Sequence, residues 1–265
     1  MDYLAAPQTQ LVINTPARCS ADSGAAWIGS AWTLFKRSWL EFLVALILMF
    51  VLYFLANQIP LLSAFLAPLL AAGYLELAHR TQQDTDPSIG NLFAAFGTDK
   101  RDRLVGLLQL GGLSLLFAIV MVVLLAVGLL QLLGGLDAAL ALAQQAKSMT
   151  PEQLPQLLLT IQPNASFFIW LAGCGVLLVF YSCAVWFAVP LLWFSDKGLL
   201  EVMSLSLEAC KRNVLSLLVF ALLVVLLLLV ALIPFGLGLL VAMPVLYISS
   251  YTSFRQIFVD QPTAM

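Results

Sequence analysis

Charged residues are scarce in this 265-residue chain, and their scarcity decides its class. They make up 10% of the residues, whereas hydrophobic residues make up 62%. Soluble domains are typically about 25% charged. The composition therefore excludes an ordinary soluble protein and predicts an integral membrane protein. No basic, aromatic-rich soluble face exists, which argues against nucleic acid as a partner.

Catalytic motifs are also lacking. The chain contains one histidine, which cannot supply both a catalytic triad and a metal site. It has no G-x-S-x-G elbow, no H-E-x-x-H zinc motif, no paired intramembrane aspartates and no phosphate-binding glycine loop. The sequence therefore predicts no enzyme activity, no catalytic residue, no metal and no cofactor.

Cysteine is sparse and unpatterned. The four cysteines are Cys19, Cys174, Cys183 and Cys210. They form no C-x-x-C pair, and no histidine lies near them in the sequence, so neither a zinc site nor a redox pair is indicated. We expect all four to be reduced packing residues.

What is present is a series of long apolar runs, which predicts an all-α, polytopic transmembrane helical bundle. Six spans are expected, at about 39–56, 61–77, 104–136, 168–194, 214–233 and 237–253,. They form one membrane domain, 25–260, after a disordered polar tail, 1–24. Gly134 and Gly135 predict a break at the end of the long third run, and Pro190 and Pro244 predict kinks.

Short amphipathic helices are expected at the membrane interface before spans one, three and five. Their predicted apolar faces are, in order, Trp27, Ala31, Leu34 and Phe35; Ile89, Leu92, Phe93 and Phe96, with Ser88 as the N-cap; and Leu200, Met203, Leu207 and Cys210. A further amphipathic insertion at 137–166 contains a helix start at Thr150.

Basic pairs repeat at the ends of these short helices. When Lys36-Arg37 is set on Lys211-Arg212, the apolar runs that follow also align, and 91–110 is a looser third copy. We expect these residues to clamp the short helices to anionic lipid headgroups. The complete predicted clamp is Lys36, Arg37, Lys100, Arg101, Arg103, Lys211 and Arg212.

The Lys and Arg residues also predict the orientation. Nearly all of them fall in the two termini and in the connections after spans two and four, whereas Lys147 stands alone in the connections on the other side. Six spans with both termini in the cytoplasm satisfy this distribution. The insertion at 137–166 is then periplasmic.

The chain resembles a family of uncharacterised six-span inner-membrane proteins of Gram-negative bacteria. That family belongs to the broad group related to the membrane domain of some glycerophosphoryl diester phosphodiesterases. The stretches that carry the resemblance are AWTLFKRSWLEFL, PLLAAGYLELAHR, SIGNLFAAF, LSLEACKRNVLSLL and GLGLLVAMPVLYISSYTSFRQIF. The resemblance implies the fold and an inner-membrane location. It implies no catalytic residue, because the phosphodiesterase domain has no counterpart here.

Ionisable residues inside a span are candidates for function because hydrocarbon is a poor environment for charge. Glu76 lies about one turn inside the end of the second span, with His79 and Arg80 three and four residues later. Glu76 and His79 could form a proton-coupling or cation-coupling pair. Alternatively, Glu76 and Arg80 form a structural ion pair in the favourable helical order. Glu41 is expected to pair with Arg37 in the same way.

Tyr247, Tyr251 and Arg255 recur every fourth residue along the sixth span. They could line a polar path. Alternatively, the tyrosines anchor the helix at the interface and the arginine extends to the headgroups. Because the span centres are Leu, Val, Ala and Phe, a transport site that gathers polar groups at mid-membrane is the less favoured reading.

These observations favour a non-catalytic membrane protein that binds lipid, with anionic lipid as the candidate, or a partner membrane protein. The alternative is a transporter or exporter of a small or hydrophobic molecule. An apolar, solidly packed centre would favour the first function, and a polar cavity at mid-membrane would favour the second.

Overall fold

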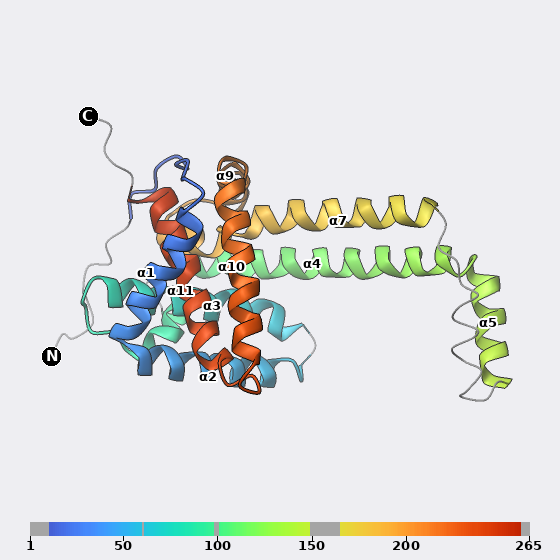
Figure 1. Ribbon diagram of the computed structural model, residues 1–265, viewed down its shortest axis with the longest axis horizontal. Helices are drawn as coiled ribbons and strands as arrows, with labels where there is room; N and C mark the ends of the chain where they lie inside the picture. Colours follow the sequence, from blue (N-terminus) through green and yellow to red (C-terminus); the bar gives the residue numbers. More distant parts are fainter. Residues whose placement is uncertain (1–10, 60, 98–100, 149–164, 261–265) are drawn as a thin grey trace. The chain divides into compact units, whose positions relative to one another are not determined.

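The computed structural model describes residues 11–59, 61–97, 101–148 and 165–260, and these are all-α with no strand. Contacts divide the chain into two units. One comprises Met1–Leu113 with Cys183–Met265, and the other comprises Ser114–Ser182. Figure 1 shows the helices, which are α1 Ser23–Arg37, α2 Trp39–Ala56, α3 Leu62–Gln82, the 3-10 helix η1 Ile89–Phe96, α4 Arg101–Leu132, α5 Leu136–Ser148, α7 Ala165–Val185, α8 Ala188–Phe194, α9 Leu199–Arg212, α10 Val214–Leu232 and α11 Leu239–Phe258.

Within the described residues, five stretches are long and apolar enough to cross a bilayer,. They are Trp39–Ala56, Leu62–Gln82, Arg101–Leu132, Ala165–Phe194 and Val214–Leu232. The all-α, membrane-type fold expected from the composition is therefore found. The predicted sixth span corresponds to α11, whose second half contains a run of Ser, Tyr and Thr hydroxyls and is less apolar. A sixth crossing stays a prediction.

The two basic pairs end their helices in the same way. Ser38 follows Lys36-Arg37 with φ −137° and ψ 48°, and Asn213 follows Lys211-Arg212 with φ −119° and ψ 25°. Each of these residues breaks the helix, and its carbonyl then accepts the first hydrogen bond of the next helix, from Phe42 or Leu217. The repeat read from the sequence is thus a repeated corner between two helices.

The first short helix, α1, packs inside the protein. Its predicted apolar face, Trp27, Ala31, Leu34 and Phe35, is buried. The neighbours are α10 and α11: Trp27 meets the ring of Phe220 at 5.8 Å, and its backbone oxygen accepts a hydrogen bond from Thr252 at 2.9 Å. The apolar stripe is correct, but it covers other helices rather than lipid, because burial against helices also satisfies an amphipathic face.

Gly24 allows α1 to approach α10 closely. A Cβ there would lie 2.5 Å from the Ser216 oxygen. At the other end of α1, Trp32 shares a groove with residues near the end of α10. The two helices therefore run side by side in the same direction, which places the basic pair of α1 and the basic pair before α10 at opposite ends.

The predicted disorder of 1–24 is wrong for the described residues 11–24. Backbone N–H groups of Asn14 and Ala17 donate to the carbonyls of Phe258 and Ile257, both at 2.9 Å. Asn213 accepts from the Cys19 N–H at 2.7 Å and donates to the Ala17 carbonyl at 2.9 Å. The segment lacks an apolar run, but its backbone is held by partners about 200 residues away, which local composition cannot reveal.

The helix predicted after the 81–87 loop is a 3-10 helix, η1. Ser88 is its N-cap as predicted and forms a capping box with Asn91. The predicted apolar face is correct only in part: Leu92 is buried, but Phe93 and Phe96 are exposed and Ala95 is buried in their place. A 3-10 helix repeats every three residues, so an α-helical spacing includes residues of the exposed side. Leu92 lies on Gly73 of α3, where a Cβ would come within 2.0 Å of its oxygen.

The predicted face of the helix at 199–212 is also correct only in part. In α9 the buried residues are Val202, Ser206, Ala209 and Cys210; Cys210 was predicted, whereas Leu200 is 83% exposed. Ser206 explains the choice: its hydroxyl accepts from the Phe187 N–H at 3.1 Å and donates to the Cys183 carbonyl at 2.6 Å. These bonds hold the break between α7 and α8 that the sequence placed at Pro190.

The second unit is a helix pair with α5. Within it, Tyr181 donates to the Ser114 hydroxyl at 2.8 Å and stacks on Phe117, while Gly128 lies against Trp170. The predicted break after the long run is confirmed, because Gly134 and Gly135 adopt φ values of +86° and +98° that favour glycine,. The predicted helix start at Thr150 lies outside the described residues.

Candidate functional site

Glu76 lies at the centre of a buried polar cluster in the first unit. Its side chain accepts from Arg80 Nε at 3.1 Å and from Trp193 Nε1 at 2.9 Å. The predicted ion pair with Arg80 is therefore present, and it also reaches α8. Glu76 is 6% exposed, so the two charge-assisted or polar donors compensate a carboxylate that water hardly reaches,.

His79, one turn further along α3, contacts different partners. Its Nδ1 lies 2.8 Å from the Tyr251 hydroxyl of α11. The rings of Phe194 and Tyr251 pack around the imidazole with centroids at 5.0 and 6.0 Å. Glu76 and His79 thus join α3 to two different helices, and two aromatic rings pack against the histidine.

The three residues predicted along the last span are distributed over different contacts. Tyr251 is fully buried in the cluster, Tyr247 packs against Tyr74 with centroids at 5.3 Å, and Arg255 pairs with Asp260 at 2.5 Å. Arg255 also interacts with Tyr251, its neighbour one turn back, and the polar path stays a prediction. Because packing and hydrogen bonding occupy these side chains, the geometry matches the structural reading better than a polar path.

Trp193 is the cluster member that sequence reasoning missed. It is fully buried, and its indole N–H needs an acceptor when it leaves water,. A weak signal existed: Trp193 and Glu76 both lie near the ends of their apolar runs on the predicted cytoplasmic side. Only the packing of α8 against α3 shows that the two residues meet.

The predicted basic clamp divides into individual contacts. Arg37 pairs with Asp84 at 3.4 Å rather than with Glu41, and Arg103 pairs with Asp196 at 3.5 Å. Lys36 lies 6.0 Å above the Trp32 ring, and Arg212 pairs with Glu208 at 2.5 Å. Arg101 and Lys211 are exposed, and Lys100 lies outside the described residues. The two Lys-Arg pairs lie at opposite ends of the α1–α10 pair, and protein acids neutralise several of the cations, so these residues do not form one basic surface. Their binding to anionic headgroups stays a prediction.

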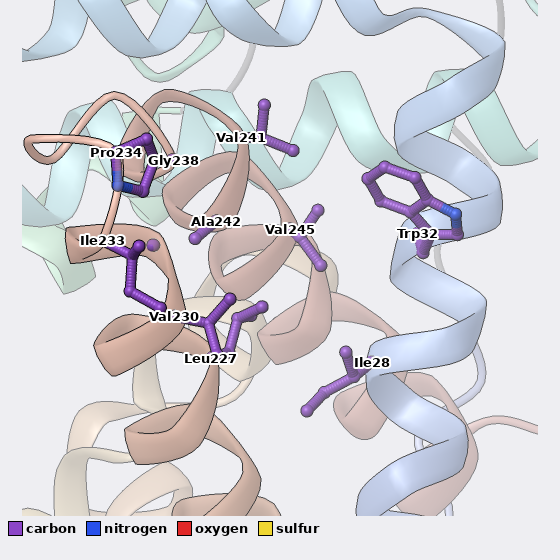
Figure 2. Close-up of a pocket in the computed structure, with 11 residues that line it drawn as sticks. Ile28, Trp32, Leu227, Val230, Ile233, Pro234, Gly238, Val241, Ala242 and Val245 are labelled. Atoms are coloured by element: carbon purple, nitrogen blue, oxygen red, sulfur yellow. The ribbon is translucent and has the colours of Figure 1, made fainter.

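An apolar groove lies among α1, α10 and α11. Its volume is about 550 Å³. Figure 2 shows side chains from the three helices facing a common space, with Ile28 and Trp32 from α1, Leu227 and Val230 from α10, and Val241 and Val245 from α11. The lining contains no charged residue. Such a groove can hold a hydrocarbon chain but offers nothing to bind an ion.

The cysteines give no sign of redox or metal chemistry. All four are free, and no group of three or more His, Cys, Asp or Glu side chains gathers into a metal site within the described part of the chain. Burial raises the pKa of the Cys19 thiol, and burial together with the neighbouring Cys183 raises that of Cys210 to about 12. Both thiols are therefore protonated and weakly nucleophilic at neutral pH.

No family model, curated protein or solved structure matches this chain. The family resemblance drawn from its sequence therefore stays a prediction.

Proposed function

We propose that this protein is a non-catalytic integral membrane protein that binds lipid, with an acyl chain in the groove between α1, α10 and α11. The groove carries the proposal: it is large enough for a ligand, and pockets of roughly 300–1,000 Å³ are typical binding sites,. Its lining is apolar, and only Trp32 carries a side-chain hydrogen-bonding group,.

The surroundings of the groove indicate which apolar ligand occupies it. Large apolar side chains in the groove wall and next to it are exposed, including Ile233 in the wall and Leu229, Phe235 and Leu237 beside it. In a bilayer such residues are covered by lipid tails, so the groove continues a lipid-facing surface. An acyl chain can enter from the side without crossing a polar barrier.

The packed polar cluster supports binding over transport. A proton-coupled transporter needs a carboxylate that exchanges protons with water during its cycle. Glu76 is instead enclosed by Arg80, Trp193 and the helices that carry them. Between α3 and α11, Tyr74 packs against Tyr247 and His79 lies against Tyr251, so side chains occupy the space between these helices.

The location also belongs to this proposal. We propose the bacterial inner membrane from the family resemblance, and both termini in the cytoplasm from the distribution of Lys and Arg. Reporter fusions test it: fusions after Lys100, Lys197 and Met265 should read cytoplasmic, and one near Lys147 should read periplasmic. A cytoplasmic signal at Lys147 would contradict the six-span topology.

A groove-filling variant tests the binding function. Val230→Trp places an indole in the groove, and Val225→Trp places the same residue on the exposed face of the same helix. The amount of lipid retained per protein after purification in mild detergent is measured by mass spectrometry. We expect Val230→Trp to retain less lipid than the wild type and Val225→Trp to retain as much. Equal retention in both variants would refute binding in the groove.

A further inference from the structure

A second pocket lies at the opposite end of α10 from the apolar groove. Its volume is about 430 Å³, and the N-terminal segment forms one wall and the α9–α10 corner forms the other. Unlike the groove, it mixes polar and apolar lining: Arg18, Lys211 and Arg212 bring three guanidinium or ammonium groups, and Leu215 and Leu218 bring apolar surface. We call it the corner pocket.

The cations of the corner pocket are in two different states. Arg212 is held in place, because it pairs with Glu208 and donates to the Pro16 carbonyl at 3.1 Å. Arg18 and Lys211 are exposed and form no ion pair with any described residue. Arg212 therefore builds the wall, whereas the other two offer charge to a ligand.

The wall itself is built by hydrogen bonds. Asn213, which is 1% exposed, binds the backbone of Ala17 and Cys19, and the Ser216 hydroxyl donates to the Ser20 carbonyl at 2.8 Å. These bonds bring Arg18 to Lys211 although the two residues are far apart in the sequence. The pocket is a product of the fold rather than of a local basic run.

Exposed leucines continue from the pocket along α10. Leu215 and Leu218 line it and are 63% and 60% exposed, and Leu222, Leu226 and Leu229 follow at helical spacing, also exposed. Because α10 is apolar and long enough to span a bilayer, this stripe faces hydrocarbon in a membrane,. Free positive charge thus lies directly next to an apolar stripe, an arrangement complementary to an amphiphile with a negative head.

We propose that the corner pocket binds the headgroup of an anionic glycerophospholipid, whose acyl chains lie along the leucine stripe of α10. Arg18 and Lys211 pair with the phosphate, since Arg and Lys donors bind phosphate oxygens through charge-assisted hydrogen bonds. The inference rests on the proposed function, because it requires α10 to lie in a bilayer. It concerns a separate site, and it specifies that the bound lipid is anionic. A zwitterionic lipid has the same phosphate but loses the net attraction.

Cys19 reports on occupancy because it lines the pocket and is half-buried. The full-length protein in mild detergent is treated with N-ethylmaleimide at about pH 8.5, near the ordinary thiol pKa, and Cys19 alkylation is read by peptide mass spectrometry. The probes are dioctanoyl phosphatidylglycerol, dioctanoyl phosphatidylcholine and inorganic phosphate. Native mass spectrometry counts the lipids bound and provides a second readout.

Phosphatidylglycerol should slow Cys19 alkylation at concentrations at least about fivefold lower than phosphatidylcholine, since each Lys or Arg contributes roughly 1 kcal/mol of attraction. Lys211→Gln and Arg18→Gln should each weaken this protection about fivefold. Lys36→Gln makes the same charge change at the opposite end of the α1–α10 pair, and it should have no effect. Inorganic phosphate should not protect at the lipid concentrations.

Three results would overturn the inference. Equal protection by both lipids would remove the role of charge, equal protection by phosphate would indicate a soluble anion as the ligand, and an equal effect of Lys36→Gln would remove the site. If these results appear while Val230→Trp still lowers lipid retention, the proposed function stands and only the headgroup site is wrong. If Val230→Trp also leaves retention unchanged, both proposals fall.

Discussion

The two helix corners of this protein share a sequence pattern and a backbone geometry, but the side chains of their corner residues make different hydrogen bonds. After Lys36-Arg37 the corner residue is Ser38, whose side chain makes no capping bond. After Lys211-Arg212 it is Asn213, whose side chain binds the N-terminal segment and α9. The comparison teaches that the repeated pattern fixes where a helix turns, whereas the corner residue decides what the turn supports.

Replacement of the two corner residues should give the largest difference in stability between the corners. Asn213→Ala removes bonds to Cys19, Ala17 and Ala209 and leaves a buried donor and acceptor unpaired. We expect a loss of about 3 kcal/mol of unfolding free energy. Ser38→Ala should cost less than about 1 kcal/mol. Denaturation in mixed micelles measures both, and equal losses would contradict the difference between the corners.

The close contact between α1 and α10 should have the second-largest effect on stability. Gly24 of α1 lies against the α10 backbone, so Gly24→Ala forces the helices apart and should cost about 2 kcal/mol,. Gly29 lies in the same helix with nothing within 4 Å of an added Cβ. Gly29→Ala is the matched control and should stabilise by about 0.5–1 kcal/mol through helix propensity. A loss in both variants would show that α1 tolerates no substitution and that the contact is not specific.

Two polar contacts of the buried cluster differ in charge, the Glu76–Arg80 pair within α3 and the His79–Tyr251 contact between α3 and α11, and their loss should have a smaller effect. Glu76→Gln on α3 weakens a charge-assisted pair and should cost about 1–2 kcal/mol, and adding Arg80→Gln should recover part of the loss. Tyr251→Phe on α11 removes the contact with His79 and should cost about 1 kcal/mol,. A stable, correctly inserted Glu76→Gln protein that behaves like a deletion would instead favour the transporter.

The reactivity of Cys19 and Cys210 tests the packing at the second corner without a change in stability. Cys210, before the second corner, has a pKa raised to about 12 by burial and Cys183, and burial also raises the pKa of Cys19. A raised pKa leaves less thiolate at a given pH, so alkylation of both should be slower than in denaturant and should rise with pH. Cys210 should react more slowly than Cys19, which is only half-buried. Fast Cys210 alkylation near pH 8 would contradict this burial.

Prediction from sequence succeeded where a local signal carries the information. The long apolar runs, the Gly134–Gly135 break, the Ser88 cap and the Glu76–Arg80 pair each depend on residues within a few positions of one another. Helical periodicity found the buried face of α1 but only one buried residue each in η1 and α9, Leu92 and Cys210. In η1 the helix type changed the period, and in α9 the buried residues are small because Ser206 and Ala209 bring the helix close to the α7–α8 break.

The candidate sites could be predicted only in part for the same reason. The sequence pointed to Glu76, His79 and Tyr251 individually, but not to Trp193 or to the pairing of His79 with Tyr251 across 172 positions. The corner pocket needs residues 18 and 211 at one place, and the groove needs three helices side by side. No periodicity encodes such long-range contacts.

The sequence by itself determined the membrane class, the apolar helices and the positions of the two corners, because hydrophobicity, glycine and proline act on the backbone locally. The tertiary structure alone decided that α1 packs against α10 and α11, that residues 11–24 are held in place, and that Arg18 reaches Lys211. Those outcomes depend on which helix surfaces fit together. An amphipathic face or a basic pair has the same sequence whether lipid or another helix covers it.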